Sequence, residues 1–276
     1  RSSEKEEPGA WGGIHICGRA HTNAEGGKGS SEIGGAVYGG NDDADNSGTL
    51  QYIRLEYTGF AFDEEHEANG ISFYGVGNGT IVDHCQAYKG SDDGFEFFGG
   101  SVNVSNLVAV SCSDDSFDWT EGWNGKGTNL VAYQEAESTL GYDCDCLMEC
   151  DNNGSNNAAT PVAHPVLKNL ILVGNGGSKQ GIRLRAGTEV EIDNAKVCGK
   201  GQPLTVETAL TENALKNGTS KLTNITLTSE LSCKEGIYTH ADFIAVTSNK
   251  VDANLSYSSF EDIKKECSWM NGSWVK

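Results

Sequence analysis

Short stretches of alternating apolar and polar residues recur along most of the chain. One unit, a polar residue followed by two apolar positions separated by a single residue, occurs seven times. Its copies occupy residues 52–55, 84–87, 106–109, 129–132, 169–172, 194–197 and 224–227. The shortest spacings between successive copies are 22 and 23 residues, which fits one coil of a three-sided β-helix, and the longer spacings accommodate loops at the corners. The pattern therefore predicts a solenoid of short parallel strands.

Asparagine opens five of these seven units, always at the same offset from the apolar pair. Strands of neighbouring coils lie about 4.8 Å apart, so stacked Asn side chains can hydrogen-bond to one another from coil to coil. The preference of Asn for turns is an alternative explanation. The repeated offset favours an Asn ladder at a corner of the coil.

A second set of strands follows the first, at residues 70–73, 94–97, 116–119 and 181–184. Period-two alternation directs Phe95, Phe97, Phe117 and Trp119 towards the interior and the residues between them outward. Parallel strands joined by short corners must coil, and the twist of β-sheets favours the right-handed sense.

The sharpest repeat relates residues 91–96 to residues 113–118, with a separation of 22 at every position. This repeat fixes the coil length and predicts that Phe95 stacks directly on Phe117. We expect an all-β fold, a right-handed parallel β-helix, with coils over residues 1–236 and a C-terminal capping segment over residues 237–276.

The capping segment carries a different pattern. Residues 258–261 resemble a capping box, and the apolar residues that follow recur at helical spacing. These are Phe260, Ile263, Cys267 and Met270. We expect a short amphipathic helix that covers the open end of the solenoid, because an exposed parallel edge invites strand addition. The N-terminal end has no such cap, which predicts contact there with other copies or subunits.

Charge and hydropathy narrow the range of partners. The chain of 276 residues has a formal net charge of −19 and a pI near 4.6, so it would repel the backbone of a nucleic acid. No run of apolar residues approaches the length of a membrane span. An acidic surface is compatible with neutral glycans and with metal cations.

Two further features favour a secreted or cell-surface glycoprotein. The first is nine cysteines, many for a cytosolic protein. The second is seven N-x-S/T sequons. Their acceptors are Asn78, Asn103, Asn153, Asn217, Asn224, Asn254 and Asn271.

The cysteines allow several arrangements. Cys85 lies among apolar strand positions and is expected to be a buried free thiol. Cys144, Cys146 and Cys150 lie close together in the sequence, between the repeat units at residues 129–132 and 169–172. They could form a local disulfide or, less in keeping with the pattern, a zinc site. A Cys233–Cys267 disulfide would attach the tail to the last coil.

Carboxylates stack in the repeat that fixes the coil length: Asp92 over Asp114, Asp93 over Asp115, and Glu96 over Asp118. Six carboxylates so close repel one another unless they keep protons or share a cation. Calcium suits oxygen-only ligands. The columns are therefore interpreted as a Ca²⁺ site, as a solvent-screened acidic ladder, or as a catalytic pair.

In the catalytic interpretation Glu96 and Asp118 act as acid/base and nucleophile of a retaining glycosidase. Trp119 or Trp123 would then stack on a sugar. Any outward pair on adjacent coils has this spacing, so the spacing alone does not select the enzyme.

A second acidic run, containing Asp42, Asp43 and Asp45, has a composition like that of a Ca²⁺ loop. It lacks the glycine and distal glutamate of an EF-hand. A bound cation and an ordinary Asx-rich turn both fit this run.

Several motifs resemble those of a group of bacterial extracellular β-helix proteins common in Bacteroidota, with the pectate-lyase-like fold. The motifs are Trp-Gly-Gly-Ile at 11–14, the Asp-rich run at 38–48, residues 92–100 and 114–118, residues 181–188, and Trp-x-x-Gly-x-Trp at 269–274. The resemblance covers nearly the whole chain. It implies the fold, and it implies further coils before the Trp-Gly-Gly segment, but no chemistry. The cysteine and sequon counts depart from the group and suit a eukaryotic secreted relative.

Together these observations predict an extracellular or cell-surface β-helix protein with a structural, adhesive or glycan-binding role, stabilised by Ca²⁺ and part of an assembly. The alternative is a polysaccharide-degrading enzyme, a glycoside hydrolase or lyase, that uses the carboxylates on the β-helix face.

Overall fold

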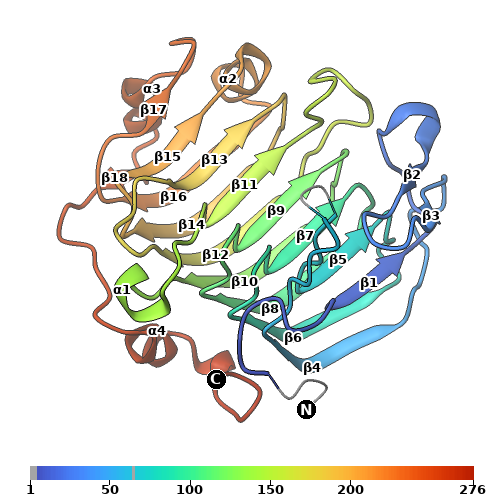
Figure 1. Ribbon diagram of the computed structural model, residues 1–276. Coiled ribbons are helices and arrows are strands. Elements are labelled where there is room, and N and C mark those ends of the chain that lie inside the picture. Colours follow the sequence, from blue (N-terminus) through green and yellow to red (C-terminus); the bar gives the residue numbers. More distant parts are fainter. Residues whose placement is uncertain (1–4, 64–65) are drawn as a thin grey trace.

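The computed structural model describes residues 5–63 and 66–276, which form a parallel β-helix (Figure 1). Two parallel sheets of eight strands each form its walls. In spatial order, the short-strand sheet contains β1 (Ile14–Cys17), β5 (Ile71–Tyr74), β7 (Phe95–Phe98), β9 (Phe117–Thr120), β11 (Met148–Asp151), β13 (Gln180–Arg185), β15 (Gln202–Val206) and β17 (Ser232–Cys233). The long-strand sheet contains β4 (Thr49–Glu56), β6 (Ile81–Tyr88), β8 (Asn103–Val110), β10 (Lys126–Tyr133), β12 (Val166–Val173), β14 (Glu191–Cys198), β16 (Lys221–Leu227) and β18 (Lys250–Val251).

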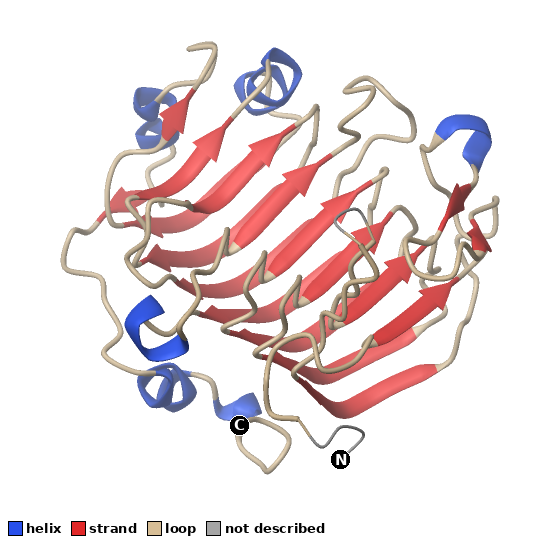
Figure 2. Cartoon of the chain, in the orientation of Figure 1, coloured by secondary structure: helices blue, strands red, loops and turns tan. Residues whose placement is uncertain are grey.

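The remaining elements lie around the two sheets (Figure 2). They are η1 (Glu25–Gly27), β2 (Gly29–Ser30), β3 (Val37–Tyr38), α1 (Glu137–Leu140), α2 (Ala209–Lys216), α3 (His240–Ala245), α4 (Phe260–Glu266) and η2 (Ser268–Met270). No helix within the described residues is long and apolar enough to cross a bilayer.

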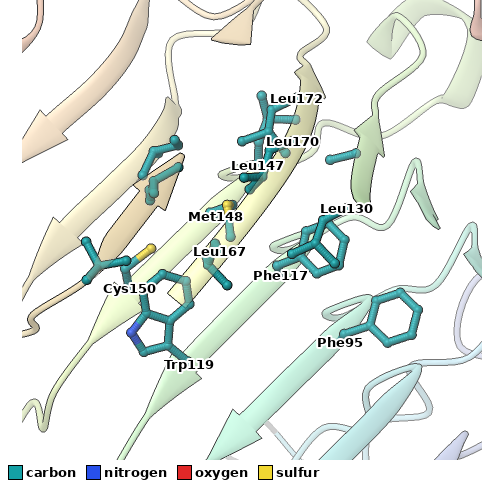
Figure 3. Close-up of a cluster of buried hydrophobic side chains, with 14 of the residues drawn as sticks. Phe95, Phe117, Trp119, Leu130, Leu147, Met148, Cys150, Leu167, Leu170 and Leu172 are labelled. Carbon is teal, nitrogen blue, oxygen red and sulfur yellow. The ribbon is translucent and has the colours of Figure 1, made fainter. Parts of the chain in front are cut away.

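The register predicted from the 22-residue repeat is confirmed. Phe95 pairs with Phe117 across β7 and β9, and their rings stack with centroids 5.5 Å apart and planes at 13°. Phe73 and Phe97 stack across β5 and β7, with ring centroids 4.9 Å apart. These side chains belong to one continuous apolar core between the sheets, part of which is drawn in Figure 3. Each coil therefore buries its apolar face only against its neighbours.

The Asn ladder also forms. Asn129 donates from Nδ2 to Oδ1 of Asn106 at 2.8 Å and accepts from Nδ2 of Asn169 at 3.0 Å. Asn194 continues the ladder onto Asn169 at 2.9 Å, whereas Asn224 donates to Asp193 instead. The ladder residues have positive φ and bend each long strand at its fourth residue, so the ladder lies within the strands. Asn tolerates the left-handed region better than most residues.

The helix expected near the C-terminus is α4, but it does not cover the end of the solenoid. The core at that end is closed by Leu215 of α2, Phe243 of α3, and Leu231 and Tyr238 between these helices. The capping box predicted at residues 258–261 does not form, because the side chain of Ser259, the N-cap residue of α4, makes no hydrogen bond to the backbone. A capping box is present instead at the start of α3, between Thr239 and Asp242.

Instead, residues 252–276 run back along the outer face of the long-strand sheet, and we call them the C-terminal strap. Ile263, Met270 and Trp274 of the strap share a second apolar cluster with Val108 and Val131 of β8 and β10. This placement arises because the outward residues at the distal ends of these strands are apolar and need cover. The strap brings the C-terminus back to the first coil (Figure 1).

The predicted disulfides are wrong. All nine cysteines are free thiols, including Cys144, Cys146, Cys150, Cys233 and Cys267. Cys85 is buried in the core as expected, and burial raises the pKa of its thiol to about 11. Most of these thiols pack as small apolar groups in the interior.

Candidate functional site

An acidic cleft with a volume of about 410 Å³ lies on the outer face of the short-strand sheet. Among the described residues, its lining contains ten carboxylates and a single arginine. These residues are Glu32, Glu67, Asp92, Asp93, Glu96, Asp114, Asp115, Asp118, Asp145, Glu149 and Arg183. The acidic cleft thus unites all six carboxylates of the sequence-predicted columns.

The floor of the acidic cleft is one outward column of the short-strand sheet. Ser72, Glu96, Asp118, Glu149 and Arg183 occupy matching positions of successive strands. Each pair is one strand spacing apart, about 4.8 Å. The predicted pair Glu96 and Asp118 is therefore confirmed as register neighbours.

One wall consists of the turns that enter these strands. Asp93 accepts a hydrogen bond at Oδ1 from the backbone N–H of Asp115, 2.8 Å away. Asp115 in turn accepts at Oδ1 from the N–H of Cys146 at 2.6 Å. Each aspartate thus caps the backbone of the next coil, which holds the two carboxylates in one column.

The acidic block has a definite length. At its first end the corresponding turn and strand carry the neutral residues Asn69 and Ser72. At its other end Lys179 pairs with Asp145 at 2.6 Å, and Arg183 pairs with Glu149 at 2.9 Å. The basic residues neutralise only the last coil of the block.

Burial and mutual repulsion act together on the central carboxylates. The pKa values of Asp93, Glu96, Asp115 and Asp118 all lie well above the ordinary range, first because of burial and then because of neighbouring carboxylates. At the rim, burial and the charge of Asp114 raise the pKa of Asp92 to about 7.

Hydrogen bonding compensates these charges only in part. Asn69 donates from Nδ2 to Oε2 of Glu96 at 2.5 Å. Within the described residues, Oδ1 of Asp118 is buried and has no hydrogen-bond partner. An acceptor oxygen surrounded by other acceptors needs a donor or a cation, which a carboxylic-acid proton, a water molecule or a metal ion can supply.

Two overlapping triads of carboxylates converge in the acidic cleft. Asp93, Glu96 and Asp118 form one, and Asp115, Asp118 and Glu149 form the other; within each, ligand oxygens lie within 4.8 Å of one another. Opposite ligands of Ca²⁺ are about 4.6–5.2 Å apart, given bonds of about 2.3–2.6 Å. These hard oxygen donors therefore fit Ca²⁺, and Asp118 belongs to both triads.

Two further groups of possible ligands lie at the edge of the cleft. Asp92, Asp93 and Asp114 form one of them. Asp115, Asp145 and Cys146 form the other, and burial raises the pKa of the Cys146 thiol well above its usual range. A protonated thiol is a poor metal ligand, so Cys146 suits a metal less well than the carboxylates do.

Trp119 and Trp123 cannot stack on a sugar in this structure. Each is only 1% exposed. Trp119 donates from Nε1 to Oγ1 of Thr188 at 3.0 Å, and Trp123 donates to the carbonyl of Val102 at 3.1 Å. Trp119 faces inward through the same alternation that directs Asp118 outward.

The structure does not bring Asp42, Asp43 and Asp45 together as one ligand set. Asp43 accepts from His21 Nδ1 at 2.7 Å, and Asp45 pairs with Arg19 at 3.1 Å. None of the converging groups among the described residues includes them. An Asx-rich loop in which Arg19 pairs with Asp42 and Asp45, and His21 with Asp43, accounts for this run.

The sequon acceptors are mostly accessible. Asn153 is half-buried, and its Nδ2 donates to Asn23; the other six are exposed. Asn224 donates from Nδ2 to Asp193 at 2.6 Å, so a glycan on Asn224 would cost that bond.

Sequence reasoning missed four acids of the cleft. Asp145 and Glu149 continue the columns of Asp114 and Asp118, but the preceding loop lengthens that coil, so the 22-residue spacing does not reveal them. Glu32 and Glu67 come from loops folded over the sheet, and no periodic signal places such loops. Glu32 is held by the Tyr74 hydroxyl, which donates to it at 3.0 Å.

Comparison with known proteins supplies the family. A family model described as a pectate-lyase-like beta helix domain matches residues 1–276, the whole chain. No curated protein and no solved structure gives a significant match.

Proposed function

Since the chain belongs to the family of pectate-lyase-like β-helix domains, we propose that it is an extracellular or cell-surface glycan-binding protein whose acidic cleft binds Ca²⁺. The residues that hold the cation are Asp93, Glu96, Asp115, Asp118 and Glu149. Asp92 and Asp114 contribute at the rim. The role is structural or adhesive, and the accessible sequons suit an exposed, glycosylated surface.

The observation that carries the proposal is the unpartnered, buried oxygen of Asp118 at the centre of two carboxylate triads. Protonation could relieve the repulsion, but it would leave several acids neutral at the pH of most extracellular fluids. A divalent cation neutralises two charges at once and satisfies the orphaned oxygen.

A cation in the cleft also provides a means of holding a glycan. Calcium takes six to eight oxygen ligands, and each triad supplies only part of such a shell. Sugar hydroxyl or carboxylate oxygens can complete it, so that an acidic glycan is attracted to a protein of net charge −19 rather than repelled.

A polysaccharide-degrading enzyme is the second candidate, because Glu96 and Asp118 are register neighbours in a cleft. A retaining glycosidase needs one protonated acid and one ionised nucleophile, so the two pKa values must diverge. Here burial raises the pKa of both carboxyls, and the two tryptophans proposed for sugar stacking are buried. Both observations favour binding over hydrolysis.

The test replaces the two wall aspartates together, Asp93→Asn with Asp115→Asn. We expect 1 mM Ca²⁺ to raise the Tm of the wild-type chain by about 5 °C or more over the chelated protein. The double variant should melt at the same temperature with Ca²⁺ and with chelator, and below the wild type in Ca²⁺. Differential scanning calorimetry measures all four states.

The matched control removes two exposed acids outside the cleft, Glu25→Gln with Glu137→Gln, and should keep the full Ca²⁺ response. A wild-type Tm that chelator leaves unchanged would refute the cation site. Release of reducing ends from a polysaccharide by the wild type, abolished in Glu96→Gln, would instead establish the enzyme.

A further inference from the structure

A second hollow, with a volume of about 560 Å³, lies on the opposite sheet at the first coil, between β4 and the C-terminal strap. It is lined by Tyr52, Arg54, Asn271, Gly272, Ser273 and Trp274, and we call it the aromatic pocket. It contains much of the Trp-x-x-Gly-x-Trp segment, which the acidic cleft does not use.

Tyr52 occupies the slot that Asn fills in the ladder of later coils, and its φ of 54° is close to the 56–65° of the ladder asparagines. In the first two coils, stacked rings replace the amide hydrogen bonds of the ladder. The Tyr52 ring stacks on the His84 ring, with centroids 4.7 Å apart and planes at 23°. β4 is the edge strand of its sheet, so no strand among residues 5–63 and 66–276 lies beyond Tyr52. Tyr52 as a whole is 62% exposed.

The strap forms a wall at right angles to this platform. Trp274 meets Tyr52 edge-on, with centroids 6.4 Å apart and planes at 84°, and Trp269 stacks behind Trp274 at 6.2 Å. Gly272 has φ +133°, and a Cβ there would lie 3.2 Å from Cδ1 of Trp274. Glycine therefore lets the strap turn closely over the indole.

Polar groups surround the rings. Arg54 donates from Nη1 to the carbonyl of Ser273 at 2.7 Å and from Nε to Glu56 at 2.7 Å. These two bonds fix a guanidinium that has five N–H donors in all. Asn271 and Ser273 also line the pocket, and both are exposed.

We propose that the aromatic pocket binds a pyranose unit of a glycan, with one face of the sugar on the Tyr52 ring. A pyranose has an apolar C–H face and a polar rim. A rigid aromatic face bordered by an arginine, an amide and a hydroxyl matches that distribution.

The backbone at Tyr52 supports this assignment. A left-handed conformation is costly for a bulky side chain, and such strain concentrates where a side chain is positioned for binding. Asn adopts this conformation at lower cost, and it occupies the slot in five other coils. Tyrosine at position 52 is therefore better explained by ligand binding than by a contribution to the stability of the fold.

The experiment uses the full chain produced in a bacterial host without N-glycosylation, so that Asn271 carries no sugar. Affinity electrophoresis is run in EDTA through gels containing soluble xyloglucan, hydroxyethylcellulose or galactomannan. EDTA removes any contribution of a cation in the acidic cleft. We expect at least one polysaccharide to retard the wild type, and Tyr52→Asn to lose at least tenfold in apparent affinity.

Tyr52→Asn is the sharpest variant because it restores the ladder residue and so should fold at least as well as the wild type. Tyr52→Phe keeps the ring and should bind. Phe62→Ala removes another exposed aromatic residue, 67% exposed, and should also bind. Glu137→Gln removes an exposed acid outside both the acidic cleft and the aromatic pocket, and should leave binding in EDTA unchanged.

Two results would overturn the proposal: a wild-type chain that no gel retards, or a Tyr52→Asn chain that is retarded as strongly as the wild type. Neither result touches the cation site, whose test is the response of the Tm to Ca²⁺.

Discussion

At the scale of single residues, the left-handed position within each long strand determines which side chains the solenoid accepts. Asn129 meets two requirements there: it adopts φ 59°, and it both donates to Asn106 and accepts from Asn169. A side chain at this slot therefore contributes through its backbone preference and through its hydrogen bonds, and substitutions can separate the two.

Asn129→Gly should keep the backbone conformation and lose both hydrogen bonds, at a cost of about 1–3 kcal/mol. Asn129→Ala should lose the bonds and also pay about 1–2 kcal/mol for the left-handed conformation. Urea unfolding measures both, and alanine should be the worse variant. Equal stability of the two variants would show that the conformation carries no penalty here.

The sequence predicts residues well where a column repeats. The Asn ladder, the Phe95–Phe117 stack and the pairing of Glu96 with Asp118 all follow from fixed offsets, because parallel strands one coil apart must align like residues. The same reasoning fails for Glu32, which reaches the cleft from a non-repeating loop. It also fails for the cysteines, because pairing depends on side-chain directions that spacing does not determine.

At the scale of elements, a turn and the strand after it form the repeated unit of the acidic cleft. Two units supply a turn aspartate and a strand carboxylate: Asp93 with Glu96, and Asp115 with Asp118. The next unit supplies Cys146 with Glu149. The units with Asn69 and Arg183 end the acidic block, so its length is set by which units carry acids.

This arrangement predicts how stability depends on pH. Folding raises the carboxyl pKa values, for Asp92 to about 7, above an unfolded value of about 3.9. The folded state then binds more protons than the unfolded state, so the free energy of unfolding falls as pH rises from about 4 to about 7. In the presence of a chelator, we expect the free energy of unfolding to fall by roughly 2–4 kcal/mol between pH 5 and pH 8. Urea unfolding at each pH measures this difference.

Calcium should flatten that slope, because it binds the ionised carboxylates and so stabilises the folded state most at high pH. The Asp93→Asn, Asp115→Asn chain should also show a flatter slope in chelator. The charged groups around these acids, Glu32, Glu67, Lys179 and Arg183, are common to both chains. A chelated wild type that gains stability from pH 5 to pH 8 would contradict the raised pKa values.

The predicted C-terminal helix illustrates the limit of sequence reasoning at this scale. The helical spacing of Phe260 and Ile263 correctly predicted α4, because such spacing indicates a helix with one apolar face that is buried against another part of the protein. It does not report which surface covers it. The end of the solenoid was already closed by Phe243 and Leu215, and the apolar outer face of β8 and β10 accepted α4 instead.

At the scale of the whole molecule, the C-terminal strap changes the mechanics of the solenoid. Coils of a solenoid contact only their neighbours, so the two ends of an array can unfold independently. The strap contacts distant coils at once: Glu266 pairs with Lys196 of β14 at 2.6 Å, and Lys276 pairs with Glu56 of β4 at 2.6 Å. Gln86 of β6 binds the backbone of Lys276 as well.

Detaching the strap should therefore uncouple the ends. Ile263 of α4 is fully buried in the apolar cluster between the strap and the long-strand sheet, and Ile263→Asp places a charge there at a cost of several kcal/mol. Hydrogen exchange followed by mass spectrometry should show residues 49–56 and 191–198 exchanging together in the wild type and at different rates in the variant. Leu210→Asp is the control, because it also replaces an apolar side chain by aspartate but at an exposed position of α2. In this variant the two segments should still exchange at a common rate. A common rate in Ile263→Asp would mean that the coils themselves, through their stacked core, supply the cooperativity attributed to the strap.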